Sequence, residues 1–549
     1  MTKRYFLMAM LLGAAAIASA QDTYLNDRLT ATDDVIGTAR YVGMGGAMGA
    51  LGADLSVMSS NPAGTALYRK SDVGLTFGAI MPNKANGWNS DDGNRTFNEK
   101  LARASFDQMG FVWSLRNDGS KLKYINFGIN YQKKANYNMG FYADNINLGG
   151  LSQMDQVAEL ANEGFDTDYN LTGLAVDNDY LSSDELGYYN AYRGESSKYT
   201  RHQRGSMQSF DMNLSFNVND RFYTGFTMSV DRLDYVSWSM YQELNTDADG
   251  NYGDYMLYND RDIEGHGLNL KFGFIGRPIE ESPFRIGLAI ETPTWYRFSN
   301  STLYDLTDDV QGVRTNTLES YLEYTVRTPW RTRLSLGSTV DKLLAWGIEY
   351  EFANTSKTSM GYPTWDDDGY HSAYKNTKDL AMNQLTKDRL RGQHTIRLGM
   401  EVKPVDPVAI RVGYNFVSSR YKNNPYFDQF ALDSKAMNYQ TSTDYMTLGP
   451  ANIVTFGLGF KYKKFYADVA YKYRVQNAKF YAFDTGFTEK YNSDGSYTQF
   501  FIDHAPVELG GNATGSDILY GPNDEFLTIN PTKVDLHRHQ LMLSLGFKF

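Results

Sequence analysis

The residues that most strongly suggest chemistry are the glycines of GTARYVGMGGAMGALGADLSVMSSNPAG, which runs from Gly37 to Gly64. A dinucleotide-binding turn has the pattern G-x-G-x-x-G directly after a buried strand. Counting from Gly43 and Gly45, the third glycine would fall at position 48, where the chain has Met48. No Gly-Lys-Ser or Gly-Lys-Thr sequence of a phosphate-binding loop occurs in the run. The spacing therefore argues against a nucleotide site.

Three further groups have residue types that bind metals. Asp247 to Asp254 (DADGNYGD) has acid spacing like that of a calcium loop, but its glycine stands at the fourth position instead of the sixth. We interpret it, and Trp365 to His371 (WDDDGYH), as solvated hairpin tips. His537 and His539 share a strand face without a Cys or Glu partner nearby, and we interpret them as rim residues. No catalytic arrangement stands out, so the sequence predicts no enzyme, no metal site and no cofactor.

The first twenty residues, MTKRYFLMAMLLGAAAIASA, have the form of an export signal. Lys3 and Arg4 precede an apolar run, and Ala18-Ser19-Ala20 provides small residues for cleavage. We expect the mature chain to begin at Gln21. The formal net charge of −11 gives no reason to expect a nucleic-acid partner. A mean hydropathy of −0.48 is compatible with a membrane β-barrel, in which lipid-facing residues alternate with polar ones.

Alternation with period two recurs along the chain. The last residues, QLMLSLGFKF, place five apolar side chains from Leu541 to Phe549 on one face. Alternation over about ten residues fits a strand tilted across a bilayer. Fourteen segments show it, near 73–81, 106–115, 125–131, 210–218, 222–230, 268–274, 284–290, 325–337, 344–352, 396–402, 408–414, 452–462, 465–473 and 540–549. The sequence predicts an all-β fold, a 14-stranded antiparallel transmembrane β-barrel, rather than a soluble sandwich or propeller.

The connections between these segments alternate in length. Short links follow the even-numbered strands, whereas the links after odd-numbered strands are long and reach roughly sixty residues near 138–204 and 476–536. This is the pattern of an outer-membrane barrel with short periplasmic turns and both termini in the periplasm. We predict a signal peptide at 1–20, a plug inside the barrel at 21–70, and the barrel with long extracellular loops at 71–549.

Inward positions of the predicted strands carry charges of both signs. A turn centred on Asp341 would place Arg333 opposite Glu349 and Arg331 opposite Glu351. Two interpretations stay open. The charges either solvate and stiffen the barrel wall, or form a polar ladder that guides an ionic solute.

The glycine-rich segment resembles the amino-terminal hatch of the FadL family, outer-membrane transporters of long-chain fatty acids and other hydrophobic compounds. The resemblance rests on Ala39-Arg40, on Gly43, Gly45 and Gly46 before Ala47, on Ala53-Asp54, and on Asn61, Pro62, Ala63 and Gly64. It implies a barrel closed by a hatch, passive uptake of hydrophobic compounds, and sideways exit through an opening in the wall. In such a hatch, glycines allow close backbone packing against the inner wall and positive φ angles.

One loop segment is a candidate for ligand capture. LSQMDQVAELA places Leu151, Met154 and Val157 along one helical face. This face either captures ligand outside the barrel or caps the barrel.

A barrel of this kind has three alternative functions: protein docking, open diffusion and energy-coupled uptake. A barrel of this family can instead be a docking platform for protein secretion or surface attachment, which the long acidic loops would suit. A diffusion porin needs no glycine-rich plug, and energy-coupled uptake uses a far larger one. The expected partners are a hydrophobic small-molecule ligand, outer-membrane lipid and lipopolysaccharide and, for the docking alternative, another outer-membrane or secreted protein.

Overall fold

The computed structural model describes residues 20–82, 103–117, 121–145, 147–148, 150–162, 170–178, 180–183, 189–246, 252–308, 316–341, 343–367, 372–422, 434, 439, 441–483, 487–491, 497–501, 507–509 and 531–549. The predicted signal peptide, apart from Ala20, lies outside these residues, as do the centres of the two acidic motifs. None of the helices in these ranges combines the length and apolar character that a membrane-spanning helix needs.

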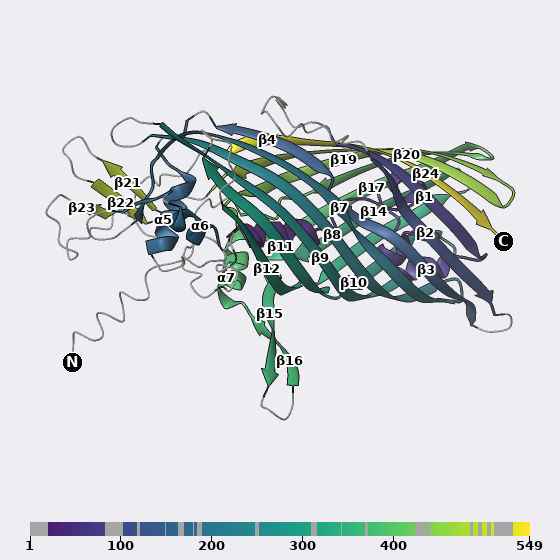
Figure 1. The fold of residues 1–549 in the computed structure, drawn as a ribbon. Helices are drawn as coiled ribbons and strands as arrows, with labels where there is room; N and C mark the ends of the chain where they lie inside the picture. Colours follow the sequence, from purple (N-terminus) through teal and green to yellow (C-terminus); the bar gives the residue numbers. More distant parts are fainter. Residues whose placement is uncertain are drawn as a thin grey trace.

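Fourteen antiparallel wall positions form a closed barrel, which confirms the predicted fold class (Figure 1). They are β1 (Asp72–Pro82), β2 (Arg103–Arg116), β3 (Leu122–Asn136) with β4 (Met139–Asn145), β7 (Arg193–Val218), β8 (Phe222–Thr246), β9 (Tyr252–Gly276), β10 (Arg285–Glu291) with β11 (Trp295–Asp308), β12 (Asn316–Arg327) with β13 (Arg331–Val340), β14 (Leu344–Asn354), β17 (Gly392–Val405), β18 (Val408–Val417), β19 (Tyr445–Tyr462), β20 (Phe465–Tyr481) and β24 (Thr532–Lys548). The barrel closes where β24 pairs with β1, with Leu545 opposite Leu75.

The remaining strands lie outside the wall. They are β5 (Ser182–Ser183), β6 (Tyr189–Asn190), the hairpin of β15 (Ser359–Asp367) and β16 (Ser372–Lys378), and the small sheet of β21 (Phe487–Tyr491), β22 (Tyr497–Phe501) and β23 (Val507–Leu509). The helices are α2 (Ala20–Thr30), α3 (Ala39–Gly43), α4 (Val57–Ser60), α5 (Gln153–Asn162), α6 (Leu171–Asp177) and α7 (Leu380–Arg389), with 3-10 turns η1 (Pro62–Leu67) and η2 (Thr355–Lys357). Figure 1 shows α5 and α6 at the end of the barrel opposite the C-terminus.

A belt of large apolar side chains covers the outside of the barrel. Phe272 is 50% exposed, Leu458 60% and Leu543 41%, while their strand neighbours on the other face are buried. A water-soluble protein rarely exposes a continuous apolar surface of this extent, and a barrel in lipid requires one. The belt therefore identifies a membrane-spanning barrel.

The strand register corrects one sequence prediction. The β13–β14 pairing places Arg333 opposite Glu351 and Arg331 opposite Ala353, a shift of two residues from the prediction. The reason is the register at the end of the hairpin, where Val340 lies opposite Leu344.

The strands also extend much further than a bilayer requires. β7, β8 and β9 have 26, 25 and 25 residues, whereas about ten cross the membrane. The predicted loops at 138–204 and 476–536 are therefore partly strand, since β4, the start of β7, and parts of β20 and β24 fall within them.

Candidate functional site

The chain from α2 to β1 lies inside the barrel. All seven residues predicted as the hatch motif (Gly43, Gly45, Gly46, Asn61, Pro62, Ala63 and Gly64) are buried. Asn61 caps η1, because its side-chain oxygen accepts a hydrogen bond from the Ala63 N–H at 3.2 Å. Its side-chain nitrogen donates to the Gly49 carbonyl at 2.8 Å. The Asn-Pro-Ala motif therefore joins the two halves of this luminal segment, which we call the hatch segment (residues 23–71).

The hatch segment packs against the wall backbone to backbone. Gly45 has φ +61°, and a Cβ there would lie 2.8 Å from the Leu398 carbonyl oxygen. The wall has glycines at the inward positions that face the hatch segment, and an added Cβ on any of them would meet that segment. They are Gly225, Gly273, Gly287, Gly337, Gly347, Gly399, Gly413 and Gly457. Several of these glycines are direct cross-strand partners, as in Gly225–Gly273 and Gly399–Gly413. This ring of wall glycines is a feature that sequence reasoning missed.

Ion pairs hold the first part of the hatch segment to β20 and to the loop after β18. Asp33 lies 3.1 Å from Arg474 and 2.9 Å from Arg420, and Asp34 lies 2.7 Å from Lys472. Burial alone would raise the pKa of Asp33, but the two arginines outweigh it and hold the pKa below its ordinary range. The same balance, with Lys472 as the main cation, lowers the pKa of Asp34.

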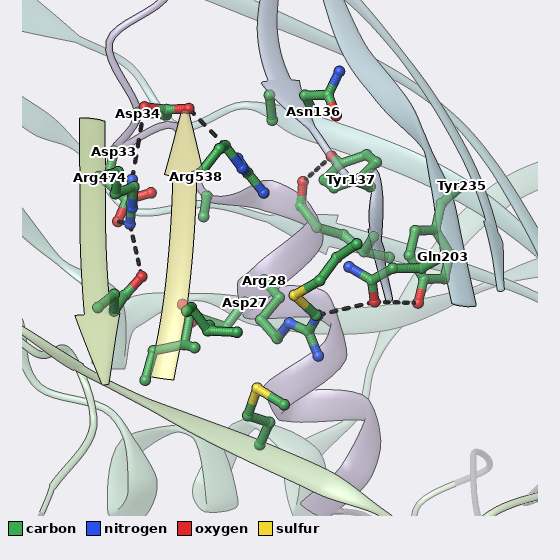
Figure 2. Close-up of a pocket in the computed structure, with 18 of the residues that line it drawn as sticks. Asp27, Arg28, Asp33, Asp34, Asn136, Tyr137, Gln203, Tyr235, Arg474 and Arg538 are labelled. Atoms are coloured by element: carbon green, nitrogen blue, oxygen red, sulfur yellow. Dashed lines mark hydrogen bonds and ion pairs between the residues drawn. The ribbon is translucent and has the colours of Figure 1, made fainter. Parts of the chain in front are cut away.

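A cavity of about 130 Å³ lies between α2 and the wall (Figure 2). Its apolar lining is Leu25, Leu29, Ala135, Met139, Met446, Leu448 and Leu536. Its charged lining is Asp27, Arg28, Asp33, Asp34, Arg420, Arg474 and Arg538. Four arginines face three aspartates, and burial raises the pKa of Asp27 despite its contacts with Arg420 and Tyr421, so the lining favours an anion. The cavity fits a molecule with an apolar body and a negatively charged end.

The cavity reaches the wall where the described residues show an interruption of the backbone pairing between neighbouring strands. β24 pairs with β1 only as far as Arg538 opposite Pro82, and β3 pairs with β2 only as far as Gln132 opposite Gln108. Beyond these points, within the described residues, β4 pairs only with β7 and the start of β24 only with β20. β4 and β24 lie next to each other there, and both contribute lining residues, Met139 and Leu536 among them.

His537 also lines this cavity, although it alternates along β24 with Leu536 and Arg538. Its Nδ1 is 2.7 Å from the hydroxyl of Tyr473, and the two rings stack. His539 makes the same 2.7 Å contact with Tyr471. Among the described residues no group of three or more His, Asp or Glu side chains is placed to hold a metal ion.

The residues predicted for ligand capture lie in the core of a cap over the barrel. Met154 and Val157 of α5 are each 1% exposed and pack in a cluster with α6 and the ends of β7 and β9, with Leu151 at its edge. The buried carboxylate of Glu243 accepts from the Gln153 N–H at 2.9 Å at the start of α5. This geometry gives the α5 face a packing role, and a capture role for it stays a prediction.

The inward charges of the wall form a closed network beneath the cavity. Arg333 pairs with Glu351 at 2.7 Å and with Glu291 at 3.2 Å, and it donates to the Ser60 carbonyl of the hatch segment at 3.1 Å. Arg397 pairs with Glu349 at 2.9 Å. Because these charges pair with one another and bind the hatch segment, their geometry favours the interpretation that they stiffen the wall.

The fold and the site together define a membrane β-barrel with a luminal hatch segment and an amphipathic cavity that meets the wall. No protein-family model matches the sequence, and no curated protein sequence matches it. Among solved structures, the chain is similar to a Pseudomonas aeruginosa FadL homologue at 12% identity (94% of this chain, 99% of that chain, TM-score 0.47). It is also similar to the CymD monoaromatic hydrocarbon channel at 11% identity (94% and 97%, TM-score 0.48) and the Pseudomonas putida toluene transporter TodX at 10% (95% and 100%, TM-score 0.45). At identities of 10–12%, the similarity to these three structures is one of fold.

Proposed function

We propose that this protein is an outer-membrane transporter for the passive uptake of hydrophobic compounds such as long-chain fatty acids. The observation that carries the proposal is the cavity beside α2. Part of its lining is apolar, and its arginines outnumber its aspartates. It lies next to the place where β4 and β24 adjoin without paired backbones in the described residues. Burying each CH₂ group of a ligand in such a lining contributes about 0.8 kcal/mol. A fatty acid has the required apolar chain and single negative charge.

The hatch segment supports a sideways route in this proposal. It packs against the inward glycines of eight wall strands, from β8 to β19, so a molecule in the cavity meets a filled lumen below it. The interruption between β4 and β24 offers an easier route from the cavity into the bilayer than the lumen does. In the described residues, side-chain packing replaces backbone hydrogen bonds between these two strands. The ligand would thus enter at the long-loop end and leave into the bilayer.

Uptake of radiolabelled oleate tests this proposal. The barrel is expressed in a Gram-negative host that lacks its own fatty-acid uptake barrel, and initial rates are compared with those of the host alone. Met139 of β4 lines the cavity and packs against buried inward-facing side chains. Met139→Trp would fill the cavity at the wall, and we expect it to reduce the uptake rate about tenfold, as a loss of about 1.4 kcal/mol would.

The control carries the same new side chain on the outside of the barrel. Thr224 of β8 is exposed between Phe222 and Phe226 on the lipid-facing surface, and Thr224→Trp should leave uptake unchanged. Wild-type uptake no faster than that of the host alone would contradict the proposal and favour the docking platform. Full uptake by a folded Met139→Trp barrel would instead contradict the route through the wall.

A further inference from the structure

A second, smaller cavity next to the first contains three arginines and one aspartate. Its lining includes Arg28 of α2, Arg201 of β7, Arg261 of β9 and Asp444 of the segment before β19. The two cavities share Leu25, Arg28, Tyr235 and Met446 in their linings, so they are adjacent and Arg28 lies at their junction. Figure 2 shows Arg28 directed toward Gln203 and Tyr235 in the larger cavity.

The aspartate neutralises only one of these arginines. Arg201 lies 2.5 Å from Asp444, and its guanidinium also lies over the ring of Tyr199. Arg28 donates to the neutral side chain of Gln203 at 3.0 Å, and Arg261 to the hydroxyl of Thr441 at 3.1 Å. In the part of the chain that the structure describes, neither of them has a carboxylate partner.

Arg261 is buried and Arg28 is half-buried, which makes the missing counter-ion significant. Arg261 is 6% exposed, and its Nε has no hydrogen-bond partner, nor has the Nε of Arg201. A buried guanidinium without a counter-ion is costly unless another anion completes the site. The chain as a whole has a net charge of −11, so a local excess of two positive charges runs against its composition.

We infer that the two cavities together bind a phosphorylated amphiphile, with its alkyl chain in the larger cavity and its phosphate monoester between Arg28 and Arg261. This inference rests on the proposed function and specifies its substrate class. A phosphate monoester has about two negative charges at neutral pH and three acceptor oxygens, which match two guanidinium groups in charge and in donor geometry. A single carboxylate would leave one arginine uncompensated.

The dimensions of the site place the headgroup at the junction. The smaller cavity has a volume of about 20 Å³, which admits one or two headgroup oxygens, since a water-sized group needs about 10–15 Å³. The phosphorus atom therefore lies beside Arg28. The chain then extends along Leu25, Met446 and Leu448, which line the larger cavity.

Binding of four probes to the full-length barrel in nanodiscs tests the inference. The probes are dodecyl phosphate, dodecanoate, dodecanol and inorganic phosphate, and dissociation constants are measured at pH 7.5. We expect dodecyl phosphate to bind at least tenfold more tightly than dodecanoate, and inorganic phosphate alone to bind weakly. Because the second pKa of a phosphate monoester is about 6, this preference should shrink between pH 7.5 and pH 5.

Two variants locate the headgroup. Arg28→Gln and Arg261→Gln should each weaken dodecyl phosphate binding at least tenfold and leave dodecanol binding unchanged. Arg232→Gln is the matched control, because Arg232 is exposed and pairs with Asp234 outside the cavities. All variants are first checked for the wild-type thermal unfolding midpoint.

The outcomes separate this inference from the proposed function. Equal affinity for dodecyl phosphate and dodecanoate, or an Arg261→Gln barrel that binds dodecyl phosphate like the wild type, would overturn the phosphate assignment and leave uptake of simpler amphiphiles standing. Inorganic phosphate that binds as tightly as dodecyl phosphate would overturn the amphiphile and point to free phosphate. Failure of all three C12 probes to bind would overturn both.

Discussion

Gly43 of the hatch segment and Gly457 of β19 face each other without side chains between them. A Cβ on Gly43 would lie 3.0 Å from the Cα of Gly457, and a Cβ on Gly457 would lie 3.1 Å from the Cα of Gly43. Contact between two backbones at this distance is possible only where neither residue has a side chain. The hatch segment and the barrel wall are therefore fitted to each other, and changes on either side should disturb the other.

The wall glycines give the first prediction. A Cβ on Gly413 of β18 would lie 2.5 Å from the Cα of Gly45, a backbone atom that no rotamer change can move. We expect Gly413→Ala to weaken the seating of the hatch segment by about 1–3 kcal/mol, the usual cost of overpacking. The barrel should still insert, because the strand pairing is unaffected.

Trypsin cleavage within the hatch segment and ion conductance in planar bilayers measure this effect. Both should rise in Gly413→Ala. Gly276→Ala is the control, since its Cβ would meet only the edges of two side chains, Phe274 at 3.3 Å and Phe222 at 3.9 Å. Equal cleavage rates for wild type and Gly413→Ala would mean that the close packing does not hold the hatch segment.

The second prediction concerns the buried ion pairs of the wall. Replacing Arg333 with Gln removes the ion-pair partner of Glu291 and a donor to the Ser60 carbonyl, whereas Glu351 keeps its ion pairs with two other arginines. Because removal of one partner leaves a buried charge uncompensated, Arg333→Gln should lower the free energy of unfolding by about 3–5 kcal/mol. Arg232→Gln removes an exposed pair and should cost less than about 1 kcal/mol. Heat-induced unfolding in detergent, followed by gel mobility, compares them.

The third prediction is a dependence on acid pH. The pKa of Asp33 is lowered from its ordinary 3.8 by Arg474 and Arg420, against the effect of burial. A lowered pKa adds stability that is fully present above pH 3.8 and is lost as the pH falls through the folded-state value. The stability that the ion pairs of Asp33 give to the hatch segment should therefore be constant from pH 7 to pH 4 and decrease below pH 4.

Pepsin, which is active in acid, measures release of the hatch segment. In wild-type protein the hatch segment should resist cleavage at pH 4 and become sensitive toward pH 2. In Asp33→Asn it should be sensitive at both pH values. The difference in cleavage rate between wild type and Asp33→Asn should decrease as the pH falls. A wild type that is already cleaved at pH 4 would contradict the assigned ion pairs.

The fourth prediction separates the two roles considered for α5. Val157 is 1% exposed in the cap, so Val157→Ser should destabilise the cap by about 2 kcal/mol and increase protease cleavage around α5 and α6. Leu380→Ser, at a position that is 76% exposed, should have no effect. If Val157 captures ligand instead, Val157→Ser will weaken oleate binding without a change in cleavage.

The sequence by itself determined the wall of this protein. Alternation along QLMLSLGFKF and thirteen other segments located every wall position, because lipid on one side and a filled lumen on the other impose period two on each strand separately. The glycines from Gly43 to Gly52 likewise indicated close backbone packing, a property that belongs to the residues themselves.

Tertiary structure decided what the lumen contains. The partner of Arg333 depended on where the β13–β14 turn centres, and a shift of two residues leaves the alternation pattern unchanged. Arg28, Arg201 and Arg261 are far apart in the sequence and line one cavity only because α2 folds back into the barrel. Alternation predicts which face a side chain occupies, whereas its neighbours across a lumen depend on barrel closure and on the path of the hatch segment, which no local pattern encodes.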